Sequence, residues 1–550
     1  MSAPRRRIVV SSALVAFAAG CGAPHAGPAP LFSGLGPYHR VASVQGEPAQ
    51  RYFDQAMVWM FGFNHDQAIR SFAEAARLDP QCAMAWWGIA LCSGPHINNP
   101  VVPPERARAA WDAIAQARRR AAHATPLERA LIEAAAARYS ANFQADRRSL
   151  DAAYADAMGK VFAAHRDDPD VGVLYAEALM DLQPWDLWTR DGQPKGRASE
   201  IIAVLEGVLA RHPRHPGATH LYIHAVEASP RPRRAMAAAD VLRTLAPDAG
   251  HLVHMPAHID VRVGHWAAAA DQNVAAIAAD QRFGRLVPPT GFYHVYMAHN
   301  HHFLSFASMM EGRSAVALRA ARDMLASVPA EFVRTQAPLI DPYAAIVLDV
   351  LMRFGRWDDL LREPPPPAQL PITTALYHFT RGVAQAAKGD LPAAGRERER
   401  FAAAARAVPA DALMAINRAH DVLEIARGVL DGEIAYREGK IDAAVASLRD
   451  AVEREDRLLY MEPPEWIQPV RHTLGAILED AGRQAEAEQV FRADLERWPE
   501  NGWALFGLGR SLRSQGRVAD AEAVQARFRT TWARADVKIG ASCLCVAKGQ

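Results

Sequence analysis

The 550-residue sequence predicts an all-α fold, a superhelical solenoid of stacked helical hairpins. Three observations predict it: small and apolar positions recur after 34 residues near the C-terminus, turn residues recur along the chain, and half of all residues are apolar. A single hairpin cannot bury its apolar face alone, so hairpins of this kind stack on one another. The recurring positions are Leu474, Gly475, Leu478, Gly482 and Ala487, repeated as Leu508, Gly509, Leu512, Gly516 and Ala521.

Turn residues divide the chain into units of 34 to 50 residues. Glycine permits the backbone conformation that ends a helix, and proline cannot continue one. The predicted turns are at Pro230, Gly264, Gly312, Gly355, Gly389, Gly439, Gly482 and Gly516. Units longer than 34 residues predict insertions, which we place at 282–295, 363–372, about 406–424 and 456–470.

A proline-rich segment breaks the predicted solenoid into two arrays. Glu363 is followed by four consecutive prolines, which form a stiff, non-helical stretch. Residues 22–46 are rich in proline, glycine and alanine and are typical of a flexible linker. The predicted organisation is a tether over 22–46, an N-terminal array over 47–362, a break at 363–372, a C-terminal array over 373–540 and a tail over 541–550.

The N-terminus is typical of an export signal. Three arginines at positions 5–7 precede an apolar run over 8–19 that is too short to span a membrane as a mature helix. The following Ala18-Ala19-Gly20-Cys21 resembles a bacterial lipoprotein box. The resemblance implies a signal peptide over 1–21, lipidation of Cys21, and a membrane anchor on the periplasmic side of the cell envelope. An ordinary cleaved signal with a chance cysteine is the alternative.

Composition and missing motifs exclude several classes of protein. The 62 basic and 61 acidic side chains give a net charge of +1, which argues against a nucleic-acid partner because phosphate binding needs a basic surplus. Five cysteines are too few for a disulfide scaffold, and no apolar run of about 18 residues follows residue 30. The sequence contains no Walker loop, no Gly-x-Ser-x-Gly elbow, no c-type haem motif and no His-Glu-x-x-His.

Histidines cluster in the middle of the chain. Ten of the 21 lie within residues 220–302. Counted backwards from Pro230, Gly264 and Gly312, eight candidate ligands fall at offsets of 13, 10, 6 or 3 residues. At about 100° per residue these offsets form one stripe, about 80° wide, on the first helix of each hairpin, about 135° from the face that packs against the second helix. The eight residues are His220, His224, Glu227, His251, His254, His258, His299 and His302.

Several segments resemble the tetratricopeptide repeat, in which small residues lie where two helices cross. One unit is completed by Ala68, Phe72, Ala75 and Pro80. Longer segments, such as Gly250-His251-Leu252-Val253-His254-Met255-Pro256, are similar to a family of exported bacterial tetratricopeptide-repeat proteins with a histidine-rich central region. The resemblance covers residues 48–540 and implies the solenoid fold and an envelope setting. It also implies that the histidine stripe lines the concave groove where such arrays bind ligands.

The chemistry of the stripe points to a metal. Imidazoles at i and i+4 share one helix face, a common ligand arrangement that His220/His224 and His254/His258 both have. Neighbouring helices lie about 8–10 Å apart, so side chains from three helices can converge on one or two ions. The expected cofactor is a transition metal, copper, iron or zinc, because imidazole suits all three. Glu227 is a candidate ligand or a candidate catalytic base, and spacing does not distinguish these roles.

Two classes of function remain open from the sequence. In the first, the solenoid binds a transition metal through its histidines, as a carrier, a sensor or a redox or hydrolytic enzyme. In the second, it is an interaction scaffold whose groove binds a peptide or anionic ligand without metal. Trp185 and Trp188 lie in a loop that either closes over the groove or is anchored by its tryptophans. Cys543 and Cys545 either pair with other cysteines or bind a soft metal weakly.

Overall fold

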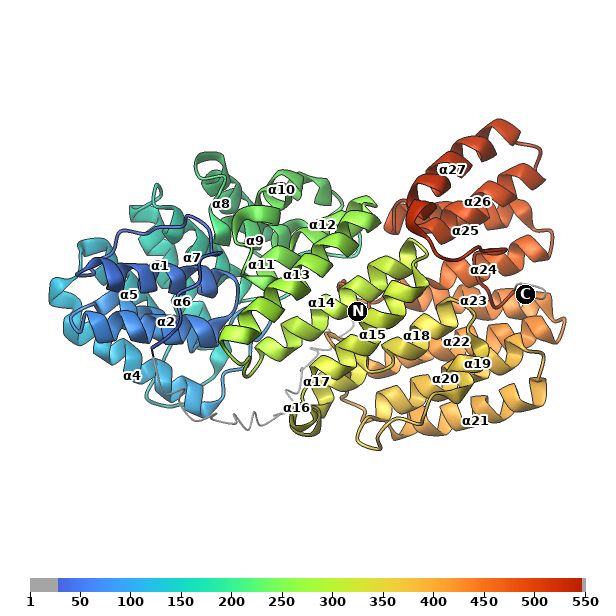
Figure 1. Ribbon diagram of the computed structural model, residues 1–550, viewed down its shortest axis with the longest axis horizontal. Helices are drawn as coiled ribbons and strands as arrows, with labels where there is room; N and C mark the ends of the chain where they lie inside the picture. The colour runs from blue at the N-terminus through green and yellow to red at the C-terminus, as the bar shows by residue number, and fades with distance from the viewer. Residues whose placement is uncertain (1–27, 547–550) are drawn as a thin grey trace, which may run out of the picture. The chain divides into compact units, whose positions relative to one another are not determined.

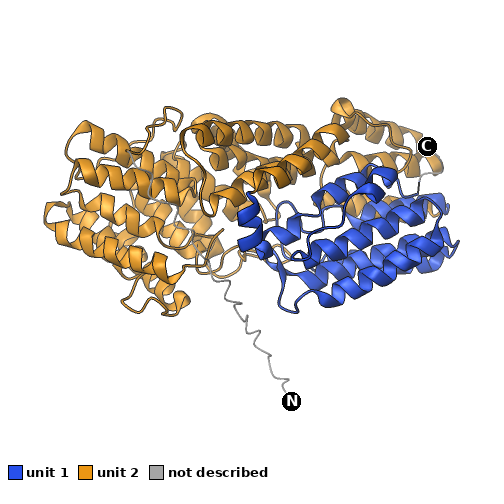
Figure 2. Ribbon diagram, turned by 60° about the horizontal axis from the view of Figure 1, so that its bottom comes forward, with its two compact units in different colours: residues 1–19, 329–482, 543–550 blue, residues 20–328, 483–542 orange. Residues whose placement is uncertain are grey.

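The computed structural model describes residues 28–546 and is all-α, as the sequence predicts. The predicted signal peptide and Cys21 lie outside the described residues. The described chain forms two compact units (Figure 2). Unit 2 contains residues 28–328 and 483–542, and unit 1 contains residues 329–482 and 543–546.

Unit 2 consists of helices from both ends of the described chain (Figure 1). Its helices are α1 (Glu47–Phe61), α2 (His65–Leu78), α3 (Ala83–Cys92), α4 (Pro104–Arg120), η1 (Ala121–His123), α5 (Pro126–Ala136), α6 (Arg147–Ala164), α7 (Pro169–Met180), α8 (Ala198–Arg211), α9 (Pro216–Val226), η2 (Pro232–Ala235), α10 (Met236–Leu245), α11 (Gly250–His254), α12 (Pro256–Val263), α13 (Trp266–Leu286), α14 (Tyr293–Met310), α15 (Ser314–Ser327), α25 (Gln484–Arg497), α26 (Gly502–Ser514), α27 (Val518–Thr531) and η4 (Trp532–Arg534).

Unit 1 is also helical, with one short hairpin of strands between two of its helices. Its elements are α16 (Ala330–Thr335), α17 (Ala337–Ile340), η3 (Asp341–Tyr343), α18 (Ile346–Arg353), α19 (Trp357–Arg362), α20 (Pro371–Ala387), α21 (Leu391–Ala407), β1 (Leu413–Met414), β2 (Asn417–Arg418), α22 (Ala419–Arg437), α23 (Ile441–Glu455) and α24 (Val470–Asp480). The strands are antiparallel and lie in the insertion predicted at about 406–424.

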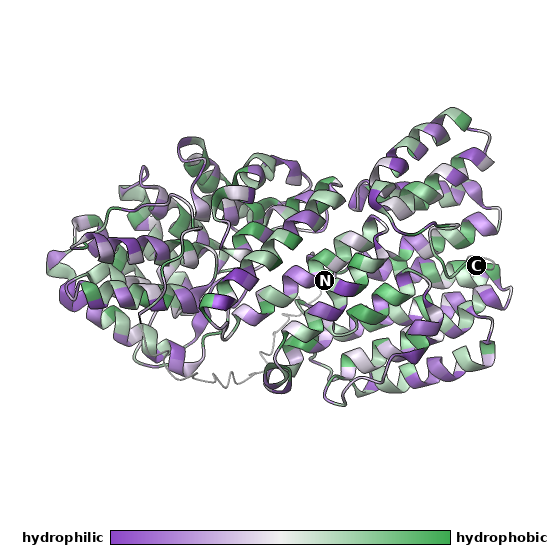
Figure 3. Cartoon of the chain, viewed as in Figure 1, coloured by the Kyte–Doolittle hydropathy of each residue, from purple (hydrophilic) through white to green (hydrophobic). Residues whose placement is uncertain are grey.

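Consecutive helices pack as hairpins, which confirms the predicted fold class. In unit 2, α1 packs on α2, α14 on α15 and α26 on α27; in unit 1, α20 packs on α21 and α22 on α23. Hydrophobic and hydrophilic residues alternate along the helices of both units (Figure 3). Small residues allow the close crossings: a Cβ added to Gly88 would lie 2.4 Å from the ring of Phe72. Among residues 28–546, no helix combines the length and hydropathy needed to cross a bilayer.

The predicted turn glycines end helices in the left-handed conformation. Gly264 follows α12 with φ of 84°, and Gly312 follows α14 with φ of 78°. Glycine is favoured there because a Cβ is strained at positive φ. The other five predicted turn glycines also have positive φ: Gly355, Gly389, Gly439, Gly482 and Gly516.

The boundary between the units differs from the predicted one. The sequence predicts a break at 363–372, but residues 363–370 are a loop between α19 and α20 inside unit 1, and α20 begins at Pro371. The division instead follows Val328, and residues 483–542 belong to the unit of the N-terminal helices. The indole of Trp503 donates to the Met309 carbonyl at 2.7 Å, which is one of the contacts that join α26 to α14. Such a long-range contact has no local sequence signal.

The described part of the predicted tether packs against unit 2. The backbone N–H of Gly34 donates to Asp248 at 3.1 Å, and the Tyr38 hydroxyl donates to Asp170 at 2.6 Å. Leu35 is buried, and the Arg40 guanidinium bonds to the buried Asp170 at 2.5 Å. Residues 28–46 are therefore an ordered strap, because side chains of the helices satisfy their backbone and polar groups.

Candidate metal centre

The predicted stripe residues come from three consecutive hairpins of unit 2. His220 and His224 lie on α9, and Glu227 caps its C-terminus. His251 and His254 lie on α11, and His258 lies on α12 after a break at Pro256, whose ring nitrogen cannot donate a helical hydrogen bond. His299 and His302 lie on α14. The break divides what the sequence predicted as one helix, yet it keeps His254 and His258 in contact.

Six of these histidines form two groups of three. In the first histidine group, one ligand atom from each residue lies within 4.8 Å of the others; the members are His220, His224 and His251. The second histidine group meets the same criterion and consists of His254, His258 and His299. In the second group, the Nε2 atoms of His254 and His258 are 2.8 Å apart, and those of His254 and His299 are 3.1 Å apart. His302 is buried but belongs to neither group.

Fixed acceptors orient four of the six rings through Nδ1. The Nδ1 atom of His220 lies 2.5 Å from the Phe61 carbonyl, which can only accept. Glu227 accepts from Nδ1 of His224 at 2.7 Å through one carboxylate oxygen, and from Nδ1 of His258 at 2.5 Å through the other. One carboxylate therefore orients a ring of each histidine group, as outer partners of metal-binding histidines do.

Asn273 on α13 orients His254 in the same way. Its Oδ1 atom lies 2.8 Å from Nδ1 of His254, and its amide nitrogen donates to the Ala269 carbonyl at 2.8 Å. Because that carbonyl can only accept, the amide is fixed with its oxygen toward the imidazole. Nδ1 of His254 is thus a donor, and its Nε2 carries a lone pair in the neutral ring.

In the second histidine group, the lone pairs of two Nε2 atoms point at each other. A neutral imidazole has one N–H, and in His254 and His258 that N–H is on Nδ1, so two lone pairs face each other across 2.8 Å. Only a cation between them, a proton or a metal ion, removes the conflict. In the first group, Nε2 of His220 and His224 and both ring nitrogens of His251 have no hydrogen-bond partner within residues 28–546.

Burial disfavours the protonated, positively charged form of the histidines at the site. The first-group residues and His254 and His258 are buried, and His299 is partly buried. Burial lowers the pKa of His220, His251, His254 and His299 well below the usual value. Burial alone would raise the pKa of Glu227, but its interactions with His258 and His224 outweigh this and lower the pKa to about 2. The site thus combines these four neutral imidazoles with one ionised carboxylate.

Aromatic residues enclose the histidine groups. The ring of Phe63, a residue with φ of 55°, lies 4.5 Å from that of His220 and stacks on His96 at 4.5 Å. The ring of Phe303 lies 5.0 Å from that of His254. A positive φ at a phenylalanine is strained, and such strain is concentrated at functional sites. The histidine stripe does not predict Phe63, Phe303, Asn273 or the Phe61 carbonyl as parts of the site, because none of them belongs to it.

Two expectations about the surroundings of the site are resolved by the structure. The stripe does not line an exposed groove, since nearly all its members are buried where α9, α11, α12 and α14 meet. The loop tryptophans are anchored: Nε1 of Trp185 donates to Asn98 at 3.1 Å, and Nε1 of Trp188 donates to the Ala225 carbonyl at 2.9 Å. The Trp185 ring also lies 5.2 Å from that of His224, so the anchored loop packs against one member of the first group.

No family model matches the chain, and no curated protein matches it. Among solved structures it is similar to a human IFIT1 dimer with PPP-AAAA, at 11% identity over 89% of this chain and 92% of that chain, with a TM-score of 0.32. It is also similar to the APC/C hetero-tetramer Cut9–Hcn1, at 12% identity over 84% of this chain and 76% of that chain, with a TM-score of 0.31. Similarity at this level supports no inference about function.

Proposed function

We propose that unit 2 binds transition-metal ions through the two histidine groups, with one ion in each. The observation that carries the proposal is the position of the rings: Nδ1 of four rings is held by the Phe61 carbonyl, Glu227 or Asn273. In the second group, Nε2 of His254 lies against Nε2 of His258 and of His299. A proton can satisfy the pair of His254 and His258. In the first group, ring nitrogens of all three histidines lack a hydrogen-bond partner among the described residues.

The donor set favours copper or zinc over harder ions. All six proposed ligands are imidazoles, which suit copper, zinc, iron and nickel, whereas magnesium, calcium and manganese prefer oxygen. Glu227 accepts hydrogen bonds from His224 and His258, so it serves as an orienting group and not as the principal ligand. Three ligands per ion leave a coordination position open, as in metal sites that react with small molecules.

A scaffold that binds a peptide along the histidine stripe is a weaker alternative. Such a groove needs exposed side chains, but His220 and His254 are 0% exposed. A peptide therefore has no access to these rings in this structure. Helical hairpins elsewhere in the chain remain free to bind partners, but the histidine groups do not supply that surface.

The test is metal analysis of protein purified without a polyhistidine tag and offered copper, zinc and iron in turn. We expect about two ions per chain for the unaltered protein. In the double variant His220→Ala/His254→Ala neither group retains three ligands, so we expect the bound metal to fall to background. A chain that takes up none of the metals, or a double variant that keeps them all, would contradict the proposal.

His215 supplies a matched control in the same unit. It is buried and precedes α9, but both ring nitrogens are used: Nδ1 accepts from the Ala218 N–H at 3.1 Å, and Nε2 contacts Asp170 at 3.0 Å. Asparagine is a favourable N-cap, so His215→Asn preserves the start of the helix. This variant should retain both ions, which separates loss of a ligand from loss of a buried histidine.

A further inference from the structure

The two histidine groups are adjacent and share one carboxylate. Ring centroids across the groups are 5.6 Å apart for His224 and His258, and 6.0 Å apart for His251 and His254. Within the groups, the corresponding separations run from 4.7 to 6.3 Å. The nearest rings across the two groups are therefore as close together as rings within one group. Ions held by the two groups would be neighbours, each with one ligand fixed by Glu227.

The charge of the surroundings favours monovalent ions at rest. Among the described residues, Glu227 is the carboxylate that groups with these histidines, and the imidazoles are neutral ligands. Two copper(I) ions and one carboxylate sum to +1, whereas two divalent ions and one carboxylate sum to +3. Because burying net charge is costly, the smaller sum is favoured. Copper is the metal in the expected set that is stable as a monovalent ion bound by nitrogen.

The same surroundings restrict what can reach the ions. Trp185 packs on His224, Phe63 packs on His220 and Phe303 packs on the second group. His299, the partly buried member, is the least enclosed of the six. A small, uncharged molecule can enter such a site without carrying polar groups that need new partners. Dioxygen meets this description, and copper is one of the centres that proteins use for dioxygen chemistry.

From these observations, and resting on the proposed metal binding, we propose that the two histidine groups hold a pair of copper ions whose substrate is dioxygen. In the step proposed, each copper(I) ion gives up one electron and becomes copper(II). The two electrons reduce one dioxygen molecule to peroxide, so the oxygen–oxygen double bond becomes a single bond and no proton moves. The net charge of the buried site is +1 before and after the step.

Glu227 is the positioning residue of this pair. It holds His224 and His258 through separate oxygen atoms, so it fixes one ring of each group relative to the other. Glutamine at this position keeps one acceptor oxygen and replaces the other by an N–H donor. In Glu227→Gln, one of the two rings therefore loses its acceptor while all six ligands remain. Outer partners of this kind typically contribute about 10–100-fold to metal affinity or activity.

The test uses the full chain, stripped of metal and loaded anaerobically with two equivalents of copper(I), then exposed to dioxygen. We expect uptake of one dioxygen per two copper ions, a peroxide-to-copper(II) absorption band, and no paramagnetic resonance signal because the two copper(II) spins couple. Glu227→Gln should bind copper but take up dioxygen about 10–100-fold more slowly, with uncoupled copper(II) visible. Asp280→Asn is the control, since Asp280 is buried in unit 2 and bonds to Tyr293 and Asn300.

The possible results separate the two proposals. Failure to bind copper or any other metal overturns both. If two bound copper ions do not react with dioxygen, or are oxidised to isolated paramagnetic copper(II), the copper-pair proposal is wrong. The metal-binding proposal is unaffected by either result. If Glu227→Gln does not fold, His299→Ala replaces it, because this ring is only partly buried. His299→Ala should retain copper in the first group, lose the absorption band and show a paramagnetic signal; an unchanged band would also overturn the pair.

Discussion

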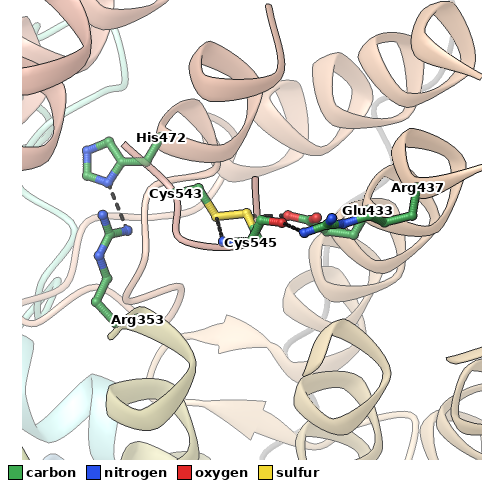
Figure 4. The surroundings of a disulfide bond; sticks show 6 residues. All are labelled: Arg353, Glu433, Arg437, His472, Cys543 and Cys545. Atoms are coloured by element: carbon green, nitrogen blue, oxygen red, sulfur yellow. Dashed lines mark hydrogen bonds between the residues drawn. A yellow bond between two sulfur atoms is a disulfide. The ribbon is translucent and has the colours of Figure 1, made fainter. Parts of the chain in front are cut away.

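Unit 2 and unit 1 each bring together potential metal ligands, but the ligand atoms differ in whether they already have a bonding partner. In unit 1, Glu433, Cys543 and Cys545 place one ligand atom each within 4.8 Å of the others, as each histidine group does. There the two cysteines form a disulfide, and the Arg437 guanidinium donates to the Cys545 carbonyl (Figure 4). The sulfur atoms satisfy each other, so proximity alone does not define a metal centre.

A buried histidine of unit 1 makes the contrast sharper. Nδ1 of His472 lies 3.2 Å from the Arg353 guanidinium, which can only donate, so this ring nitrogen is an acceptor (Figure 4). In four rings of the histidine groups, Nδ1 faces an acceptor and donates, and Nε2 keeps its lone pair. The partner of Nδ1 therefore decides which ring nitrogen is available. Among the described residues, the histidine groups of unit 2 bring several available nitrogens close together.

The largest expected effect is that metal removal destabilises unit 2 and leaves unit 1 unchanged. An ion that binds only the folded state at about 1,000 times its dissociation constant stabilises that state by about 4 kcal/mol. Amide hydrogen exchange with and without a chelator checks this by residue. We expect faster exchange in α9, α11 and α14, and constant exchange in α20 and α22. Equal acceleration in both units would show that the histidine groups are not the stabilising site.

A smaller effect is expected from Gly217→Ala, which acts on one group alone. A Cβ at position 217 would lie 2.5 Å from the ring of Phe61, whose carbonyl orients His220. Overpacking of this kind costs about 1–3 kcal/mol, and movement of Phe61 releases the His220 ring. We expect metal analysis to show one ion in place of two, and denaturant unfolding to show the lost stability.

Gly207→Ala is the matched control for this change. Gly207 lies on α8 of the same unit, and no atom lies within 4 Å of an added Cβ there. Alanine should stabilise the helix by about 0.5–1 kcal/mol and leave both ions bound. Loss of an ion in Gly207→Ala, or retention of both ions in Gly217→Ala, would contradict the prediction, because the number of bound ions would then not depend on the packing of Phe61.

The helical parts of the site could be predicted from the sequence because helix geometry is local. A period of about 3.6 residues and the turns at Gly264 and Gly312 were sufficient to place the histidines on one stripe. His302 shares the stripe but lies outside both groups. The stripe predicts on which side of its helix a residue lies, but not which residues of the neighbouring helix it meets. Asn273 could not be predicted, because its role depends on how α13 packs against α11.

The organisation of the chain was less predictable than its helices, for a related reason. The indole of Trp266 donates to the Pro499 carbonyl at 2.9 Å, which joins residues 233 positions apart. No local pattern indicates that such distant segments share a unit. A run of prolines is a local pattern, and it predicted a boundary at 363–372 that the units do not have. Residues 28–46 have the composition of a linker. Composition does not reveal that Asp170 accepts a hydrogen bond from Tyr38 and that Asp248 accepts one from Gly34.

The smallest expected effect comes from Cys543→Ser/Cys545→Ser, which tests the unit 1 cluster directly. The disulfide closes a loop between cysteines two positions apart, and the entropy that a cross-link removes from the unfolded chain grows with loop length, so its loss should cost less than about 2 kcal/mol. Metal content should stay at that of the unaltered protein, since the six proposed ligands lie in unit 2. Loss of an ion from this variant would mean that the cysteines bind metal. It would then be wrong that the paired sulfur atoms of unit 1 differ from the histidine groups of unit 2 in their ability to bind metal.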